Sequence, residues 1–443
     1  MLAGLFPCLA TALVVVTSPS SEDPPVLIRA ERVILRPGQE LANATLWIED
    51  GVIVAIGSDL AVPEGARVIE GRVVCAGFID AWSSLGLDPA GAEDMGLTAA
   101  ARTVDALDPF HLAEERREAL RAGVTSTRVQ AGRMAPFGGV GALVQTDPGF
   151  ETPVVLEDAC LASTIGITRG RTGDVFDRLS EIDRLVGALD KGKKYREGRV
   201  KFDKDLETWL KAIAEKLTTL EKDFKKAKKD REKEEKEAKE KGKEFKEKSY
   251  KEDKKPRRPR PDQNDEAMGR AADGELPLVV EVHRAAEIRR LLEKTAAFPR
   301  LRLVIAGGTE ALGFAEELAE RSIPVILWPV PMGAARPDEY DEHDLALAGE
   351  LARAGVTVAF GNGGQRDARE LRNLAALAVA HGMERQAALA ALTSVPAELF
   401  DASERLGALA PGHAADVLVL DGDPLDTTAQ IRFVLARGKV VVP

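Results

Sequence analysis

The chain has 443 residues, 44% of them hydrophobic and 30% charged, which is enough for a large folded core with an accessory domain. Its formal net charge of −11 argues against a protein that binds nucleic acid or an anionic membrane surface as a whole. The three cysteines lie far apart and form neither a metal-ligand spacing nor a disulfide framework.

Residues 1–25 contain an apolar run, Leu2–Val16, followed by small and polar residues. A run of this length is typical of a signal peptide and is too short for a secure membrane span. No lysine or arginine precedes it, so an N-terminal strand or helix stays open as an alternative. We expect a protein exported to the periplasm or another extracytoplasmic compartment, or otherwise a cytoplasmic one, without an integral membrane domain.

Short strands are predicted near both ends of the chain, where apolar and polar residues alternate. The expected strands are residues 26–35, 44–49, 52–56, 412–420 and 431–442. The corner Glu49–Gly51 is a tight-turn signal, because glycine tolerates positive φ. These strands suggest that residues 26–75 and 401–443 form one small composite β domain of the sandwich type.

Between the two ends, apolar β-branched runs alternate with amphipathic helical stretches. The expected strands are residues 125–129, 278–282, 301–305, 325–328 and 356–360, and the expected helices are residues 112–122, 285–295, 310–321 and 368–381. Repeated strand–helix units with short links indicate parallel strands, and hence a (β/α) barrel or a doubly wound sheet. The glycine cluster at Gly138–Gly141 lacks the context of a phosphate-binding loop and is interpreted as a turn.

A segment of different character, residues 190–275, interrupts this pattern. Its first part carries an apolar stripe at helical spacing, formed by Leu206, Trp209, Leu210, Ile213, Leu217, Leu220 and Phe224. About four in five residues are charged from Glu221 to Lys254, which predicts a solvated helix held by i,i+4 pairs, or disorder. The proline-rich segment Lys255–Pro261 ends any helix and forms an extended basic linker.

We interpret this segment as a charged surface insertion in a barrel loop. The alternative is a helical arm over residues 200–260, of coiled-coil type, that contacts a protein partner. Nucleic-acid binding is not expected, because acidic residues nearly cancel the basic ones and few aromatic side chains are available to stack on bases.

Several short motifs, in their order and spacing, resemble the amidohydrolase superfamily, and its imidazolonepropionase-like members in particular. The motifs are Gly77–Ala81, Arg121–Ser126, Gly138–Val144, His283–Ile288, Gly308–Ala311, Ala390–Thr393, Pro396–Ala397, Leu406–Gly407 and Pro411–Asp416. The resemblance covers most of residues 26–190 and 276–443. It implies a TIM (β/α)8-type barrel over residues 76–400 that carries the composite β domain and the charged helical insertion.

The resemblance also implies hydrolysis of carbon–nitrogen bonds other than peptide bonds. Active members hold one or two divalent metals, such as zinc or iron, through histidines that follow the barrel strands, and a final aspartate acts as ligand and base. The metal lowers the pKa of a bound water to about 7, which produces the attacking hydroxide.

The residues at the implied ligand positions of this chain differ from that pattern. Trp82 and Ser84 stand where a His-x-His pair is expected, and an indole N–H and a neutral hydroxyl are not ordinary zinc ligands. In a later His-x-His pair, Glu281 replaces the first histidine and His283 is the second. Two further positions are glycines: Gly307 stands for a histidine and Gly363 for the catalytic aspartate.

We therefore predict a metal-free, catalytically degenerate relative that acts as a binding or scaffold protein, with no cofactor and an unidentified small molecule as its ligand. The candidate pocket residues are Asp80, Trp82, Ser84, Glu281, His283 and Asn362. The alternative is an active hydrolase, with a divalent metal, whose site is rebuilt around Glu281 and His283. These two side chains share one face of a strand and could form an acid/base pair. A third hypothesis is a Ser84–His283 nucleophile pair.

Overall fold

The computed structural model describes residues 24–87, 98–108, 113–130, 136–147, 149, 154–166, 175–242, 254–328, 344–364 and 368–442. The predicted signal peptide lies almost wholly outside these ranges, and so do the side chains of Leu217, Leu220 and Phe224 of the predicted stripe. Within the described ranges, no helix is both long enough and apolar enough to span a membrane.

Eight strands form a nearly closed barrel in the order β12-β11-β10-β9-β8-β7-β6-β5. The strands are β5 (Phe78–Ser83), β6 (Val124–Val129), β7 (Gly139–Gln145), β8 (Val154–Thr164), β9 (Leu278–Val282), β10 (Leu303–Gly307), β11 (Val325–Leu327) and β12 (Val358–Phe360). Where β12 meets β5, the backbone N–H groups of Asn362 and Gly364 donate to the Trp82 carbonyl, each at 3.1 Å. The predicted barrel is therefore confirmed.

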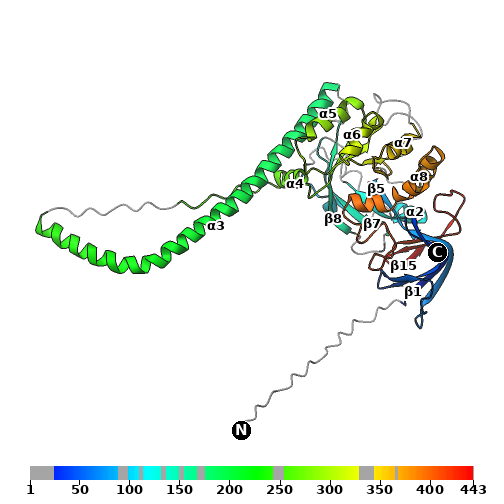
Figure 1. The fold of residues 1–443 in the computed structure, drawn as a ribbon, viewed down its shortest axis with the longest axis horizontal. Helices are drawn as coiled ribbons and strands as arrows, with labels where there is room; N and C mark the ends of the chain where they lie inside the picture. Colours follow the sequence, from blue (N-terminus) through cyan, green and yellow to red (C-terminus); the bar gives the residue numbers. More distant parts are fainter. Residues whose placement is uncertain are drawn as a thin grey trace, which may run out of the picture.

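Short helices cover the outer face of the barrel (Figure 1). They are α2 (Ala113–Arg121), α5 (Ala285–Thr295), α6 (Ala315–Glu320), α7 (Leu347–Arg353), α8 (Leu371–Ala380), α9 (Arg385–Ala390) and α10 (Ser394–Leu399), with 3₁₀ turns η1 (Thr103–Ala106) and η2 (Ala311–Phe314). Their apolar faces pack on outward-facing strand residues, while a separate cluster that includes Ile79, Val279 and Val304 fills the barrel interior. Alternate residues of each strand thus face inward, toward the candidate site.

Strand β7 departs from the predicted parallel pattern, since it runs antiparallel to both β6 and β8. Parallel neighbours need a crossover of about a dozen residues or more, and the links at residues 130–138 and 146–153 are shorter. The interpretation of Gly138–Gly141 as a turn is wrong, because Gly139 and Gly141 lie within β7. A Cβ atom on Gly139 would lie 2.5 Å from the Ala101 carbonyl oxygen. Glycine is therefore present because the Ala101 backbone packs closely against β7, and not because the chain turns here.

Strands from both ends of the chain form a seven-stranded sheet in the order β15-β14-β13-β4-β1-β2-β3. They are β1 (Val26–Arg36), β2 (Gln39–Glu49), β3 (Val52–Gly57), β4 (Arg67–Ala76), β13 (Val417–Leu420), β14 (Ile431–Ala436) and β15 (Lys439–Val442). The predicted turn between β2 and β3 has positive φ at Asp50 (51°) and Gly51 (77°). The chain ends are joined where β13 pairs with β4, so a second sheet does assemble from both termini.

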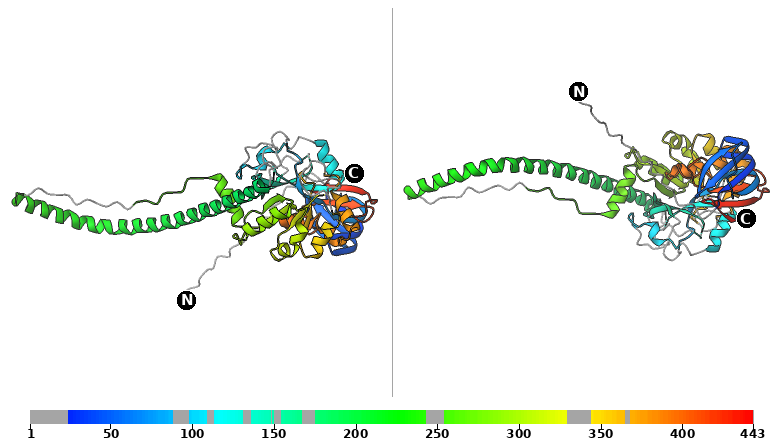
Figure 2. Two further views of the ribbon diagram at one scale, coloured as in Figure 1. Left: turned by 90° about the horizontal axis from the view of Figure 1, so that it is seen from above. Right: turned by 90° about the horizontal axis from the view of Figure 1, so that it is seen from below.

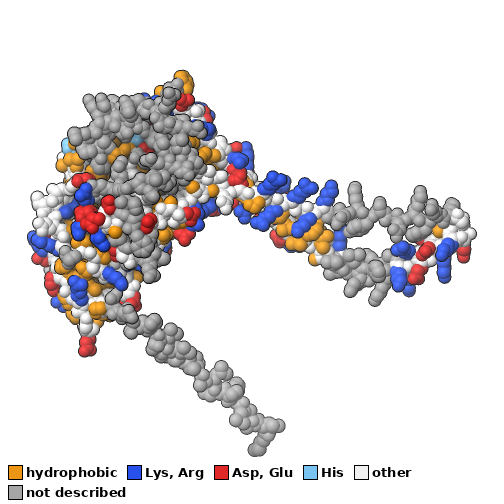
Figure 3. Space-filling view, turned by 180° about the vertical axis from the view of Figure 1, so that it is seen from behind, with side chains coloured by type: hydrophobic (Ala, Val, Ile, Leu, Met, Phe, Trp, Pro, Cys, Tyr) orange, Lys and Arg blue, Asp and Glu red, His pale blue; other side chains and the backbone are white. Residues whose placement is uncertain are grey.

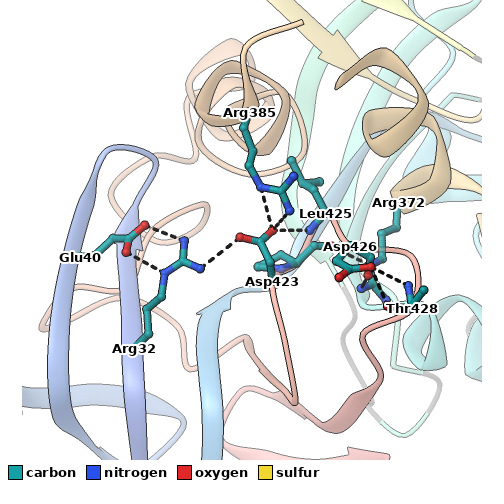
Figure 4. A network of polar contacts seen from close by, with 9 residues as sticks. Arg32, Glu40, Arg372, Arg385, Asp423, Leu425, Asp426 and Thr428 are labelled. Carbon is teal, nitrogen blue, oxygen red and sulfur yellow. Dashed lines mark hydrogen bonds and ion pairs between the residues drawn. The ribbon is translucent and has the colours of Figure 1, made fainter. Parts of the chain in front are cut away.

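A polar network fastens this sheet to the barrel helices (Figure 4). The Asp423 carboxylate accepts a hydrogen bond from Arg32 of β1 at 3.1 Å and from the Leu425 N–H at 2.9 Å, and it also pairs with Arg385 of α9. Arg372 of α8 donates to backbone carbonyls of the same loop, including Ala429 at 2.9 Å. The loop after β13 thus ties both domains together.

The insertion forms an arm that projects from the barrel in all three ribbon views (Figures 1 and 2). Its outward leg is one helix, α3 (Val175–Glu240), and its return leads into α4 (Gln263–Ala272) beside the base of α3. At that base, a Cβ on Gly192 would lie 2.4 Å from the Gly269 nitrogen, so two glycines allow the helices to cross closely. The ion pair of Lys191 with Asp265, at 2.9 Å, lies next to this crossing.

The described part of the apolar stripe stays largely on the surface of the arm. Leu206, Trp209 and Ile213 are half-buried and Leu210 is 52% exposed. Figure 3 shows hydrophobic side chains on one side of the arm near the barrel, with Lys and Arg side chains on the opposite side there. The described return segment is extended, and Lys255 lies over the Trp209 ring with Nζ 6.0 Å from the centroid. A coiled coil stays a prediction.

Candidate functional site

Glu281 and His283 lie together at the C-terminal end of β9. They follow Val279, which faces the barrel interior, so the period of two along a strand turns both side chains inward. The Glu281 Oε1 atom is 3.8 Å from His283 Nε2, and both residues are at least 98% buried. Thr164 of β8 donates to Glu281 at 3.3 Å, and His283 Nδ1 hydrogen-bonds the Thr309 hydroxyl at 2.8 Å.

Asp80 lies buried on β5, next to the end of β12. Its Oδ1 atom accepts hydrogen bonds from the backbone N–H groups of Trp82 and Asn362, each at 3.0 Å. Burial raises the pKa of Asp80 from 3.8 to about 7, although these two donors and the nearby Arg128 favour the ionised form. The structure thus brings Asp80, Trp82 and Asn362 into direct contact.

Arg128, on β6, is a buried cation in the barrel that the sequence pattern did not single out. Its Nε donates to the Ala81 carbonyl at 2.8 Å, and its guanidinium lies over the Phe400 ring, 5.6 Å from the centroid. It also pairs with Gln130. Burial lowers the pKa of Arg128, while Asp80 and Glu281 act in the opposite direction. The Arg128 guanidinium is therefore close enough to interact electrostatically with both carboxyl groups.

An aromatic cluster occupies the centre of the barrel mouth. Trp82 is fully buried and meets Trp328 edge to face, with ring centroids 4.8 Å apart at 85°. Trp328 meets the His283 ring in the same manner, at 4.9 Å and 86°. Such T-shaped contacts are favourable beyond the area that they bury. Trp328, which directly follows β11, therefore links the two sides of the candidate pocket.

Gly307 and Gly363 lie under this cluster, with positive φ of 88° and 71°. A Cβ atom on Gly307 would lie 2.5 Å from Cε1 of His283 and 2.9 Å from Cζ3 of Trp328. A Cβ atom on Gly363 would lie 2.8 Å from Cγ of Trp328. Real Cβ atoms do not approach other heavy atoms this closely, so the surrounding rings already fill the space that any larger side chain would need.

The structure does not bring Ser84 into this group. The residue follows the end of β5 in a turn, where its carbonyl accepts from the Leu87 N–H at 3.1 Å. No hydrogen bond in the described part of the chain joins the Ser84 side chain to His283, so geometry does not support the nucleophile pair. The neighbouring Ser83 is the one that faces the site, since Asn362 Nδ2 donates to its hydroxyl at 3.2 Å.

Two signals in the sequence could have identified the missed residues. Trp328 is the last residue of a predicted strand, at the end where barrel sites lie. Arg128 lies inside a predicted buried strand, and a charge in such a run needs partners.

The raised pKa of Asp80 predicts an unusual pH dependence of stability. Between the unfolded pKa, near 3.8, and the folded pKa, about 7, the folded state binds more protons than the unfolded state. The free energy of unfolding should therefore fall as pH rises through this window, by up to about 4 kcal/mol at 1.36 kcal/mol per pKa unit. Urea unfolding across the window should show that this slope is absent in Asp80→Asn.

The matched control for that experiment is Asp203→Asn, which alters an exposed aspartate of the arm. Its slope should match that of the wild type. Parallel slopes in the wild type and Asp80→Asn would show that Asp80 titrates in the same way in the folded and unfolded states.

Comparison with known proteins supports the fold and the motifs. Residues 266–442 match the sequence model of a family described as an amidohydrolase family. No curated protein sequence matches the chain. An amidohydrolase from Thermotoga maritima MSB8 is similar in structure, with a TM-score of 0.70 and 21% identity over 94% of this chain and 99% of its own.

Two other solved structures are more distant. A prolidase solved with N-methylphosphonate-L-proline has a TM-score of 0.53 and 17% identity over 94% of this chain and 99% of its own. Molinate hydrolase has a TM-score of 0.52 and 16% identity over 94% of each chain. These structural likenesses show the fold, and the likeness in sequence to the family model is confined to residues 266–442. Residues 266–442 are therefore similar in sequence to an amidohydrolase family, and the chain has the fold of the amidohydrolase from Thermotoga maritima MSB8.

Proposed function

We propose that this chain is a metal-free, catalytically degenerate amidohydrolase relative that acts as a binding or scaffold protein. The observation that carries the proposal is the position of the Trp328 indole, which covers both Gly307 and Gly363. A metal ligand or catalytic base at either position would have to displace this ring. The superfamily's usual ligands are thus replaced by glycines whose side-chain space is already filled.

The remaining side chains do not fit a zinc or iron centre. Catalytic zinc takes three protein ligands, and the described residues contain no group of three or more His, Cys, Asp or Glu side chains that could share an ion. Glu281 and His283 are also engaged with Thr164 and Thr309. Trp82 offers only an N–H donor. The usual hydrolytic route would therefore lack both its Lewis acid and its base.

Elemental analysis of protein purified without chelators tests this proposal. We expect substoichiometric zinc, iron and manganese, and an unfolding midpoint that does not change when EDTA is added. A stoichiometric metal that survives dialysis, together with a midpoint lowered by EDTA, would overturn the metal-free role.

The alternative function, hydrolysis of non-peptide carbon–nitrogen bonds, is supported by the buried carboxylate–imidazole pair of Glu281 and His283, whose nearest atoms are 3.8 Å apart. Such a pair could exchange a proton with a substrate.

A screen of amides and cyclic imides should find no turnover if the chain is degenerate. Any turnover that is lost in Glu281→Gln and His283→Gln but kept in Glu320→Gln would favour the alternative.

The arm and the N-terminal segment complete the proposal. The half-exposed stripe on α3 supports a protein partner at the arm, and export stays the expectation for residues 1–25. Deleting residues 221–260 should leave the barrel folded while removing captured partners. An unchanged set of partners and an unchanged oligomeric state would end the case for the arm.

A further inference from the structure

A cavity of about 300 Å³ lies beside the barrel wall, between strands β10–β12 and helices α7 and α8. Its walls include Leu327 and Phe360, which belong to the core between the strands and the helices, and Leu374 and Ala378 of α8. Trp328 forms the wall toward the barrel centre. The cavity is therefore lateral to the position of Glu281 and His283, which do not line it.

The lining has the chemistry of a small-ligand site. Most of its surface is aliphatic or aromatic, contributed by Leu327, Trp328, Leu345, Leu347, Ala348, Phe360, Leu374, Leu377 and Ala378. Four polar side chains complete it, namely those of Thr309, Asp344, Glu370 and Asn373. A mostly apolar cavity with a few polar groups, at the lower end of the usual size range, suits a compact ligand of about one ring.

The described part of this lining carries charge of one sign. Asp344 and Glu370 are carboxylates, and among the residues that the structure describes no lysine, arginine or histidine lines the cavity. Asp344 Oδ1 accepts a hydrogen bond from the Ala346 N–H at 2.8 Å, and Glu370 Oε2 accepts one from the Asn373 side-chain amide at 2.8 Å. Neither carboxylate forms an ion pair within the described part of the chain, whereas many other carboxylates do, such as Asp401 with Arg302 at 2.7 Å.

We propose that this cavity binds a small organic cation, an ammonium group on an apolar body of about one ring. The apolar body would pack on the leucines, and the ammonium would face the two carboxylates at the rim. Two aromatic residues, Trp328 and Phe360, also line the cavity, and a cation is attracted to the face of an aromatic ring. A carboxylate ligand of the same shape would be repelled. This inference names a ligand class for the proposed binding role and so rests on that role.

Three probes of nearly equal size test the proposal on the full-length protein: benzylamine, benzyl alcohol and benzoate. Isothermal titration at neutral pH should rank them in that order, with benzylamine at least tenfold tighter than the alcohol. The double variant Asp344→Asn, Glu370→Gln keeps both hydrogen-bond acceptors and should weaken benzylamine at least tenfold, or 1.4 kcal/mol. It should change the affinity for benzyl alcohol less than twofold.

Two further variants separate charge from space. Glu320→Gln removes an exposed carboxylate that does not line the cavity, and it should leave all three affinities unchanged. Ala378→Phe fills the cavity and should weaken all three. The ligand class is overturned if no probe binds, if benzoate binds as well as benzylamine, or if the double variant binds benzylamine like the wild type.

Failure of the cation site and failure of the proposed metal-free role would give different results. Metal-free protein that binds none of the probes would keep the degenerate role and reject the cation site. Protein that retains stoichiometric zinc and still shows the predicted ranking would keep the cavity and reject the metal-free role.

Discussion

Gly307→Ala is expected to lower the free energy of unfolding by roughly 2–5 kcal/mol, the sum of two costs. The first is the positive φ of 88°, which disfavours any residue with a Cβ atom. The second is overpacking, because the new atom would lie 2.5 Å from the His283 ring and 2.9 Å from Trp328. Urea unfolding monitored by circular dichroism measures the change.

Gly412→Ala is the matched control for backbone strain. Its φ of 87° is nearly the same, but an added Cβ would meet no atom within 4 Å. It should cost only the strain, about 1–2 kcal/mol. Equal losses of unfolding free energy in the two variants would mean that the space above Gly307 is open. A metal-binding side chain could then fit at this position.

A double-mutant cycle can assign the same effect to Trp328. The nearest contacts of a Cβ on Gly363 are all atoms of this indole. Gly363→Ala should therefore be less destabilising in a Trp328→Leu background than in the wild type, with a coupling of about 1 kcal/mol or more. Additive losses would show that the ring does not fill the space above Gly363.

Arg128→Met should destabilise the fold by about 3–5 kcal/mol, the usual result of removing one partner from a buried charged group. The substitution keeps a long apolar side chain but removes the guanidinium that lies over Phe400 and its hydrogen bond to the Ala81 carbonyl. It also leaves Asp80 and Glu281 buried without their nearby cation. Urea unfolding at neutral pH measures this loss, which should shrink in acid as Asp80 binds a proton.

Arg121→Met, on the surface of α2, provides the control. This arginine pairs with Glu114 at 3.2 Å, but both side chains are more than half exposed. Exposed pairs contribute about 0–1 kcal/mol, so this variant should remain close to the wild type. A loss at Arg128 as small as that at Arg121 would show that the barrel carboxyl groups do not depend on the guanidinium.

The sequence predicted those parts of the fold that depend on local patterns. Residues 278–282 form β9 as expected, because a short β-branched run between a polar segment and a helix reads clearly as a strand. Strand β8 was not predicted, since its first half carries the exposed or half-buried Glu157 and Asp158 and does not alternate. Strand β7 was missed because its glycines allow β8 and the Ala101 backbone to pack closely against it. Such long-range packing cannot be predicted from a local sequence pattern.

The candidate site likewise contains residues that local patterns predict and residues that they do not. The period of two along a strand is a local property, and it suffices to place Glu281 and His283 on one face. Trp328 and Arg128 were missed because their roles depend on residues across the barrel, at Gly363 and Ala81. Such contacts form only when the sheet closes into a barrel, so the periodicity of the sequence cannot predict them. The structure therefore adds the physical reason why the two glycines stay small.

The length of α3 has a consequence for the behaviour of the molecule in solution. At about 1.5 Å per residue, its 66 residues extend roughly 100 Å, several times the radius of a folded chain of ordinary size. Translational friction depends on the longest dimension more than on mass. The protein should therefore diffuse slowly and elute early from a sizing column as a monomer, so elution volume alone would mimic an oligomer.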